Sequence, residues 1–191
     1  MLSIIQELTR NATIDAAQLA EMEQFVVKKN IKKGEFLQHK GDFNNKNYFV
    51  IKGCLRSYAI DEKGKEHIFM FAPEGWIIGD VEASASNKPC ELFIDAIEDT
   101  EIETFESGLF SRVQAIQKEV FTVTNDKLMR RMAVLQQRII MLMSFSALDR
   151  YRHFVETYPN IVQRVPQKMI ASYLGITPEA LSKIRGNNNK K

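Results

Sequence analysis

The 191-residue chain contains few cysteines and few histidines, and this scarcity argues against metal chemistry. Cys54 and Cys90 are too few for a metal or cluster framework, and we expect them to be reduced, partly buried thiols. The histidines, His39, His67 and His153, include no closely spaced pair. A metal-binding barrel enzyme needs two or three histidines and a carboxylate that converge, so the sequence predicts no metal site.

Long apolar runs, a basic N-terminal leader and catalytic motifs are also missing. No stretch approaches the roughly 20 apolar residues of a membrane span. The glycines do not form a phosphate-binding loop, and no nucleophile lies beside a base in a known motif. We therefore expect a soluble, cytoplasmic protein that is not an enzyme, with no catalytic residue and no membrane partner.

The net charge is only +2, but the charges are unevenly distributed. Residues 127–191 carry 12 Lys and Arg against 3 Asp and Glu, a net charge of +9. Residues 1–126 carry 14 against 21, a net charge of −7. A basic C-terminal third on an acidic body is typical of a protein whose one end meets a polyanion.

Residues 165–185 predict two short helices around a tight turn. Pro166 suits the first position of one helix, and Gly175 suits the turn after it. Thr177 and Pro178 predict a second helix that begins with a hydroxyl cap. The apolar residues that fall on the inner faces are Ile170, Ala171, Leu174, Ala180, Leu181 and Ile184. This pattern indicates a helix-turn-helix, whose second helix enters the DNA major groove, and the alternative is an ordinary helical hairpin.

The polar residues left on the outer faces are the candidate DNA contacts. Glu179 and Lys183 are four residues apart and share a helix face. The full candidate set is Gln167, Lys168, Thr177, Pro178, Glu179, Ser182, Lys183 and Arg185. Four of them are better suited to phosphate contacts, which position a protein without specifying sequence, namely Gln167, Lys168, Thr177 and Arg185.

Residues 31–105 have a different pattern, of short strands separated by glycines. Residues 48–53 predict a strand that ends in a turn, and residues 61–65 predict a hairpin loop. Strands of this length, with turns about every ten residues, indicate an antiparallel barrel or jelly roll. Residues 2–30 before them are interpreted as helical, with Asp15 near a helix start.

Residues 107–158 predict long helices with breaks. Within them, apolar residues recur at spacings of 4, 3, 4 and 3, at Leu128, Met132, Leu135, Ile139 and Leu142. This is the spacing of a coiled-coil seam, and arginines and glutamines between residues 130 and 138 flank it. The seam predicts pairing with a second copy, and the alternative is a helix packed against its own barrel. Residues 144–149 interrupt the pattern and suggest a hinge.

Three runs, residues 34–42, 48–53 and 75–80, resemble the β-roll of the cyclic-nucleotide-binding domain. Together with the helix-turn-helix, nearly the whole chain resembles the CRP/FNR family of bacterial transcription regulators. The resemblance implies an α+β fold: an N-terminal antiparallel β-roll (a jelly roll, or double-stranded β-helix) with flanking helices, a long dimerisation helix and a small helix-turn-helix domain. The expected divisions are a sensor domain over 1–120, the dimerisation helix and hinge over 121–148, and the DNA-binding domain over 149–191. The chain ends at Lys191, so we expect no full wing after the last helix.

By this resemblance, the protein is a homodimer that binds a double-stranded DNA operator. RNA polymerase and a small-molecule effector are further candidate partners. The resemblance implies that Glu179 reads a cytosine amino group and that Lys183, commonly arginine, reads guanine or a phosphate. Pro178 replaces another common arginine, so the target sequence should differ from that of well-known relatives. The remaining alternative is an effector-binding β-roll whose helical tail docks a protein.

The family's phosphate cassette begins with Gly-Glu at a short helix and ends with Arg-Ser or Arg-Thr after a loop. The matching positions, which we take as the effector pocket, are Gly79, Asp80, Val81, Glu82, Cys90 and Glu91. An ungapped count puts Cys90-Glu91 at the Arg-Ser position, so a carboxylate replaces the cation that would hold a cyclic phosphate. The count can be off by a residue or two, but no arginine lies between residues 79 and 111.

We therefore expect no cofactor, and we do not expect cyclic AMP to be the effector. The pocket either takes a different small molecule, neutral or cationic, or is empty in a protein that acts constitutively.

Overall fold

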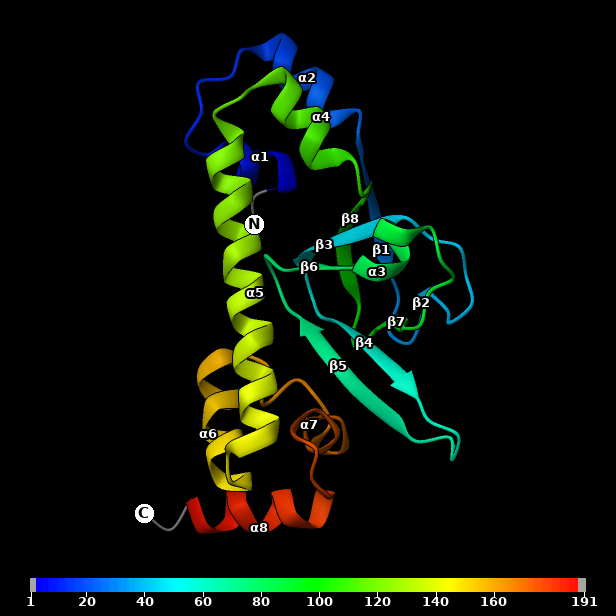
Figure 1. Ribbon diagram of the computed structural model, residues 1–191, viewed down its shortest axis with the longest axis vertical. Coiled ribbons are helices and arrows are strands. Elements are labelled where there is room, and N and C mark those ends of the chain that lie inside the picture. The colour runs from blue at the N-terminus through cyan, green and yellow to red at the C-terminus, as the bar shows by residue number, and fades with distance from the viewer. Residues whose placement is uncertain (1–2, 189–191) are drawn as a thin grey trace. The chain divides into compact units, whose positions relative to one another are not determined.

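A computed structural model describes residues 3–188 of the chain, without the side chains of residues 124, 187 and 188. The chain packs as two units. The first unit holds the chain up to Ala59 and from Met70 to Met129, and the second holds Ile60–Phe69 and the chain from Arg130 onward. Figure 1 shows the elements of each unit. The three-part division expected from the sequence stays a prediction.

The first unit is built on two four-stranded sheets, which confirms the expected β-roll. The sheet orders are β1-β8-β3-β6 and β2-β7-β4-β5, and the neighbours β1–β8, β8–β3, β3–β6, β2–β7 and β7–β4 are antiparallel. The strands are β1 (Val26–Ile31), β2 (Phe36–Gln38), β3 (Lys46–Lys52), β4 (Leu55–Ile60), β5 (Glu66–Ala72), β6 (Ile77–Ile78), β7 (Phe93–Ala96) and β8 (Thr100–Glu106).

Alternating side chains of both sheets fill the inside of this roll. Val50, Leu55, Ile94 and Ile102 belong to one buried apolar cluster and are fully buried. The turn after β3 depends on Gly53, which has a φ of +95° and lies where a Cβ would come within 2.8 Å of the backbone of Asp99 and Thr100. Only glycine fits there without strain, so the expected turn at the end of this strand is confirmed.

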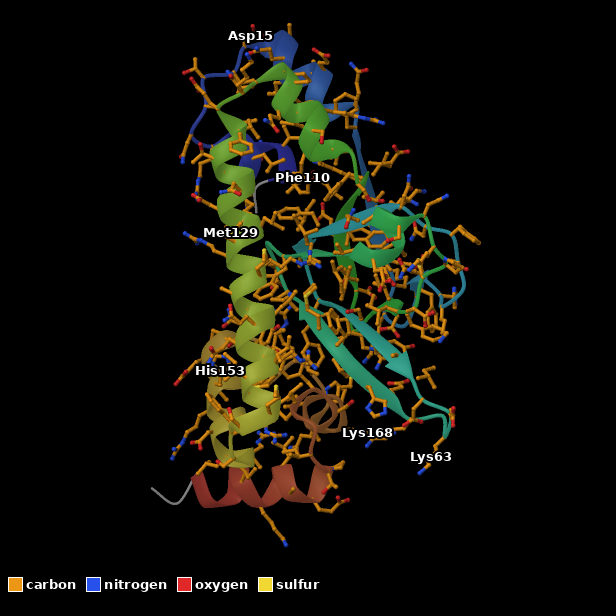
Figure 2. The ribbon with its side chains drawn as sticks, in the orientation of Figure 1. Asp15, Lys63, Phe110, Met129, His153 and Lys168 are labelled. Carbon is orange, nitrogen blue, oxygen red and sulfur yellow. The ribbon has the colours of Figure 1, made fainter. Side chains whose placement is uncertain are left out.

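Helices α1 (Ile4–Thr9), α2 (Ala16–Glu23) and α4 (Leu109–Ile116) and the beginning of α5 (Val120–Ser144) form a second apolar core in this unit. Asp15 caps α2 in a capping box, which confirms the predicted start, and Figure 2 labels it together with Phe110 of α4. The prediction of helix over residues 2–30 is wrong at its end, because β1 begins at Val26. Its β-branched residues pair along β8, and this sheet pairing overrides the helical pattern of the preceding residues.

The second unit contains the rest of α5, helices α6 (Ala147–Thr157), α7 (Gln167–Leu174) and α8 (Pro178–Asn188), and residues 60–69 of the β4–β5 hairpin. Phe154, Tyr158 and Tyr173 pack together in its core, with ring centroids 5.3–5.8 Å apart. The helix breaks after Ser144, and the Ser146 hydroxyl caps α6 by accepting a hydrogen bond from the Asp149 N–H. Of the helices within residues 3–188, none is long and apolar enough to cross a membrane.

Candidate functional site

Helices α7 and α8 form the two arms of the predicted helix-turn-helix. Gly175 ends α7 in the left-handed conformation, with φ of 65°, as the turn requires. The Thr177 hydroxyl accepts a hydrogen bond from the Ala180 N–H at 3.2 Å, and Pro178 is the first residue of α8. Leu181 is fully buried. One detail differs from the prediction: Pro166 lies at the cap position, and α7 begins one residue later.

The outer side of this pair carries the candidate DNA contacts. Arg185 is half-buried. The other seven are exposed, namely Gln167, Lys168, Thr177, Pro178, Glu179, Ser182 and Lys183. Lys168 is labelled on α7 in Figure 2. Hydrogen bonds from its own backbone N–H and from the Thr177 hydroxyl lower the pKa of Glu179, so this carboxylate is ionised and can accept a hydrogen bond. The sequence placed Thr177 against phosphate, whereas its hydroxyl is also engaged in capping α8.

Two side chains that the sequence did not single out connect the β4–β5 hairpin to α7. The Ser172 hydroxyl accepts a hydrogen bond from the Ile68 N–H at 3.1 Å and donates one to the Glu66 carbonyl at 2.7 Å. The Arg138 guanidinium donates to the Ile68 carbonyl at 2.7 Å and lies 4.0 Å from the centre of the Tyr173 ring. Arg138 therefore does not flank the seam as the sequence suggested, but joins α5, β5 and α7 within the second unit.

Arg150 fixes the break between α5 and α6 in a similar way. Its guanidinium donates to the carbonyls of Leu142, Phe145 and Leu174, at 3.2, 3.1 and 3.0 Å. These are carbonyls near the C-terminal ends of α5 and α7, which lack helical partners. A hydrogen bond from a side chain to a backbone carbonyl leaves no recurring pattern of residue types in the sequence. Arg150 could therefore not be identified from the sequence.

The predicted seam lies on a surface of α5 that the single chain leaves largely uncovered. Leu128, Met132 and Ile139 are 54%, 56% and 58% exposed, Leu142 is also exposed, and Leu135 is half-buried. An apolar row of this length is unusual on a monomeric protein surface. It is therefore the candidate contact with a second copy.

The cassette region contains the expected short helix, α3 (Val81–Ser86). Asp80 is nine-tenths buried, and its carboxylate accepts hydrogen bonds from the N–H groups of Ala83, Glu91 and Leu92 at 3.2, 2.9 and 3.3 Å. Val81, which follows it, is exposed, as is Glu82. Backbone N–H groups that could hold an anion are thus already bound to a carboxylate of the chain itself.

The charges around the cassette are also paired within the chain. Glu91 accepts from the Lys40 ammonium at 2.8 Å, and Lys88 contacts Glu82 at 3.2 Å. A Cβ at Gly79 would collide with the Asn47 side chain, so Gly79 allows a close approach between β6 and β3. The positions matched from the sequence therefore lie together but offer no free cation to a phosphate.

Two further groups, one on β4 and one in the loop before β7, bear on this cassette. The Arg56 guanidinium is buried and pairs with both oxygens of Asp95, at 2.7 and 2.8 Å, so it is not available to replace the missing arginine. Cys90 is buried, and this burial raises the pKa of its thiol. Cys54 is a buried free thiol as well.

Two of the three histidines each lie beside a single carboxylate. His67 lies 2.7 Å from Asp61 and His39 lies 3.7 Å from Asp42, both at exposed positions. In the part of the chain that the structure describes, no group of three or more His, Cys, Asp or Glu side chains could hold a metal ion.

Comparison with known proteins agrees with the fold described above. Residues 28–115 match the family described as "Cyclic nucleotide-binding domain". The Fumarate and nitrate reduction regulatory protein of Vibrio cholerae is 24% identical over 97% of this chain and 78% of that protein. The Anaerobic regulatory protein of Haemophilus influenzae is 22% identical over 97% of this chain and 76% of that protein.

A solved structure of FixK2 from Bradyrhizobium japonicum superposes with a TM-score of 0.69 at 18% identity, over 86% of this chain and 85% of that one. The regulator CLP of Xanthomonas campestris, described as responsive to c-di-GMP, has a TM-score of 0.70 at 14% identity, over 92% of each chain. At these identities the structural likeness shows the fold alone.

Proposed function

We propose that this chain, a member of the CRP/FNR family of DNA-binding transcription regulators, acts as a homodimer that reads a pseudo-palindromic operator with α8. The observation that carries the proposal is the exposed polar face of α8. Leu181 and the Thr177 cap fix this helix from inside, while Glu179, Ser182 and Lys183 stay exposed. The N-terminal part of a recognition helix meets base edges in the major groove, and these are its N-terminal residues.

We assign the contacts as the sequence suggested, with Lys183 given to a base and with Thr177 left out because its hydroxyl caps α8. Glu179 accepts a hydrogen bond from a cytosine amino group, and Lys183 donates to guanine. Gln167 and Lys168 at the start of α7 bind phosphates, together with Arg185. The net charge of +9 over residues 127–191 supports this arrangement, because it favours approach to a polyanion.

The seam on α5 supports the homodimer. Its exposed apolar residues have the heptad spacing that lets two parallel helices pack side by side. Two-fold symmetry then places the half-site centres roughly 34–36 Å apart, one turn of DNA. The bacterial cytoplasm, where operator DNA and RNA polymerase are found, is the proposed location.

For the sensor region, we propose an effector other than cyclic AMP, or none. Asp80 binds the backbone N–H groups, and Lys40 and Lys88 are each paired with a carboxylate. A bound cyclic phosphate would have to displace these interactions, and it would meet the Glu91 carboxylate where the family has arginine.

The DNA-binding proposal is tested by measuring affinity for duplex DNA at several salt concentrations. Phosphate contacts release counterions, so we expect the logarithm of the binding constant to fall linearly and steeply with the logarithm of salt concentration. If the basic tail instead docks a protein through an apolar surface, the chain will not bind DNA or heparin in a salt-dependent way. That outcome would favour the partner-docking alternative.

A further inference from the structure

Strand β5 ends one of the two sheets, and helix side chains bind its outer edge. It is the last strand in the order β2-β7-β4-β5, and an edge strand presents N–H and C=O groups that no further strand binds. The Ser172 hydroxyl accepts from the Ile68 N–H and donates to the Glu66 carbonyl, and the Ile68 carbonyl accepts from Arg138. We call these three hydrogen bonds the β5 clasp. Figure 1 shows β5 beside α7, which carries Ser172.

The Ser172 hydroxyl does not bind its own helix. A serine or threonine inside a helix commonly bonds the carbonyl four residues before it. Thr157 at the end of α6 does so, with its hydroxyl 2.8 Å from the His153 carbonyl. Ser172 lies in the interior of α7, but its partners lie 104 and 106 residues earlier in the chain. Its hydroxyl therefore joins α7 to β5.

Arg138 binds the same strand from α5. Its guanidinium donates to the Ile68 carbonyl at 2.7 Å and to the Tyr173 carbonyl at 3.4 Å, and it lies 4.0 Å from the centre of the Tyr173 ring. A planar guanidinium can stack on a ring while it donates in its own plane, which the ammonium group of lysine cannot do. Arg138 thus connects α5 with both partners of the clasp, β5 and α7.

Strand β5 belongs to both units of the chain. Its residues up to Phe69 pack with α7 and α8 in the second unit, and its residues from Met70 onward belong to the first. Met70 and Ala72 are buried in the apolar core of the β-roll. The clasp therefore holds the helix-turn-helix to a strand that the β-roll anchors two residues further on.

We propose that Ser172 and Arg138 are positioning residues for operator reading, a role that rests on the proposed function. The clasp restricts movement of α7 and α8 about the helix break after Ser144, so it limits the half-site spacing that two paired chains can read. Two linked binding modules gain affinity only where the linkage fits the span of their sites. A looser linkage has a lower effective concentration at the correct spacing and tolerates an incorrect one.

The test compares three duplexes by fluorescence anisotropy: the operator selected from random DNA, the same operator with one base pair inserted between its half-sites, and a single half-site. The insertion moves one half-site by about 3.4 Å and rotates it by about 35°. The natural protein should prefer the operator without the insertion by about tenfold or more.

Ser172→Ala should weaken binding to the operator by about threefold to tenfold, because the clasp loses both bonds of one hydroxyl. Its affinity for the inserted duplex and for the single half-site should stay within about twofold of the natural protein, so the spacing preference falls. Arg138→Lys keeps the charge but loses the planar group, and it should change the spacing preference in the same direction.

Hydrogen exchange at the Ile68 N–H measures the clasp itself. The natural protein should protect this N–H, and Ser172→Ala should speed its exchange by about tenfold. Thr157→Val is the matched control, because it removes a hydroxyl that binds within its own helix. It should change neither the spacing preference nor the exchange at Ile68, and circular dichroism should show that every variant is folded.

The outcomes separate this role from the proposed function. A natural protein that binds the operator no more tightly than a single half-site would contradict the proposed function, and the positioning role with it. If the natural protein prefers one spacing and Ser172→Ala keeps that preference in full, the positioning role alone is overturned. Equal weakening on all three duplexes would also overturn it, as would Ile68 exchange that is equally fast in the natural protein and in Ser172→Ala.

Discussion

At the scale of single residues, Lys183 is the side chain on which sequence-specific reading depends most. It is exposed on α8, four residues after Glu179. If it donates to a base, Lys183→Ala should weaken binding to the preferred operator by roughly 1–3 kcal/mol and leave binding to random DNA nearly unchanged. Fluorescence anisotropy with both duplexes measures this difference.

Lys168→Ala is the matched comparison for a phosphate contact. It should weaken binding to the preferred operator and to random DNA equally. The slope of the logarithm of the binding constant against the logarithm of salt concentration should become shallower by about one. If Lys183→Ala behaves in the same way, Lys183 is a phosphate contact and its assignment to guanine is wrong.

Glu103 on β8 should make folding stability depend on pH. Burial raises the pKa of this carboxyl, although its hydrogen bond from the Ile4 N–H, at 2.6 Å, opposes the shift. The unfolded chain therefore releases this proton first, from about pH 4.3 upward. The free energy of unfolding contributed by Glu103 is thus largest at low pH and falls as pH rises through the folded pKa.

Glu103→Gln keeps an oxygen for the Ile4 N–H but does not titrate. Urea unfolding at a series of pH values should show the variant gaining stability relative to the natural protein as pH increases. Glu101→Gln, on the same strand, is the control and should show little of this trend. A difference between Glu103→Gln and the natural protein that is constant with pH would contradict the burial argument.

At the scale of elements, local patterns predicted the helix-turn-helix and the β-roll well. Glycine at the turn, a hydroxyl cap and proline act within a few residues of one another, so Gly175, Thr177 and Pro178 are found in their expected roles. The start of β1 and the role of Arg138 could not be predicted in this way. They depend on pairing with β8 and on the carbonyl of Ile68, which lie far away along the chain.

The cassette helix α3 gives an element-scale prediction about the effector. Calorimetric titration with cyclic AMP and cyclic GMP should show no binding at micromolar concentration, since Asp80 binds the N–H groups of Glu91 and Leu92. Glu91→Arg restores the cation, and a charged hydrogen bond of about 1.5–3 kcal/mol should raise cyclic AMP affinity by roughly 10- to 150-fold over the natural protein.

Gly79 is a poor position for this test, because any larger side chain would meet Asn47 and disturb the packing of β6 on β3. Micromolar binding of cyclic AMP by the natural protein would show that the cassette has been aligned incorrectly.

At the scale of the whole molecule, the proposed function requires two chains on one operator. One α8 covers one half-site, and the exposed seam on α5 is the surface through which a second chain would join. The unequal charge distribution, −7 over residues 1–126 and +9 over residues 127–191, fits a dimer in which both basic ends meet the DNA.

The most direct test is the mass of the complex formed on an operator selected from random DNA, measured by light scattering. We expect the selected sequence to be a pseudo-palindrome with half-sites one helical turn apart. The complex should contain one duplex and two chains, adding twice the chain mass of 22.0 kDa to that of the DNA. A complex with a single chain on its duplex, or a selection that enriches no palindrome, would contradict the account.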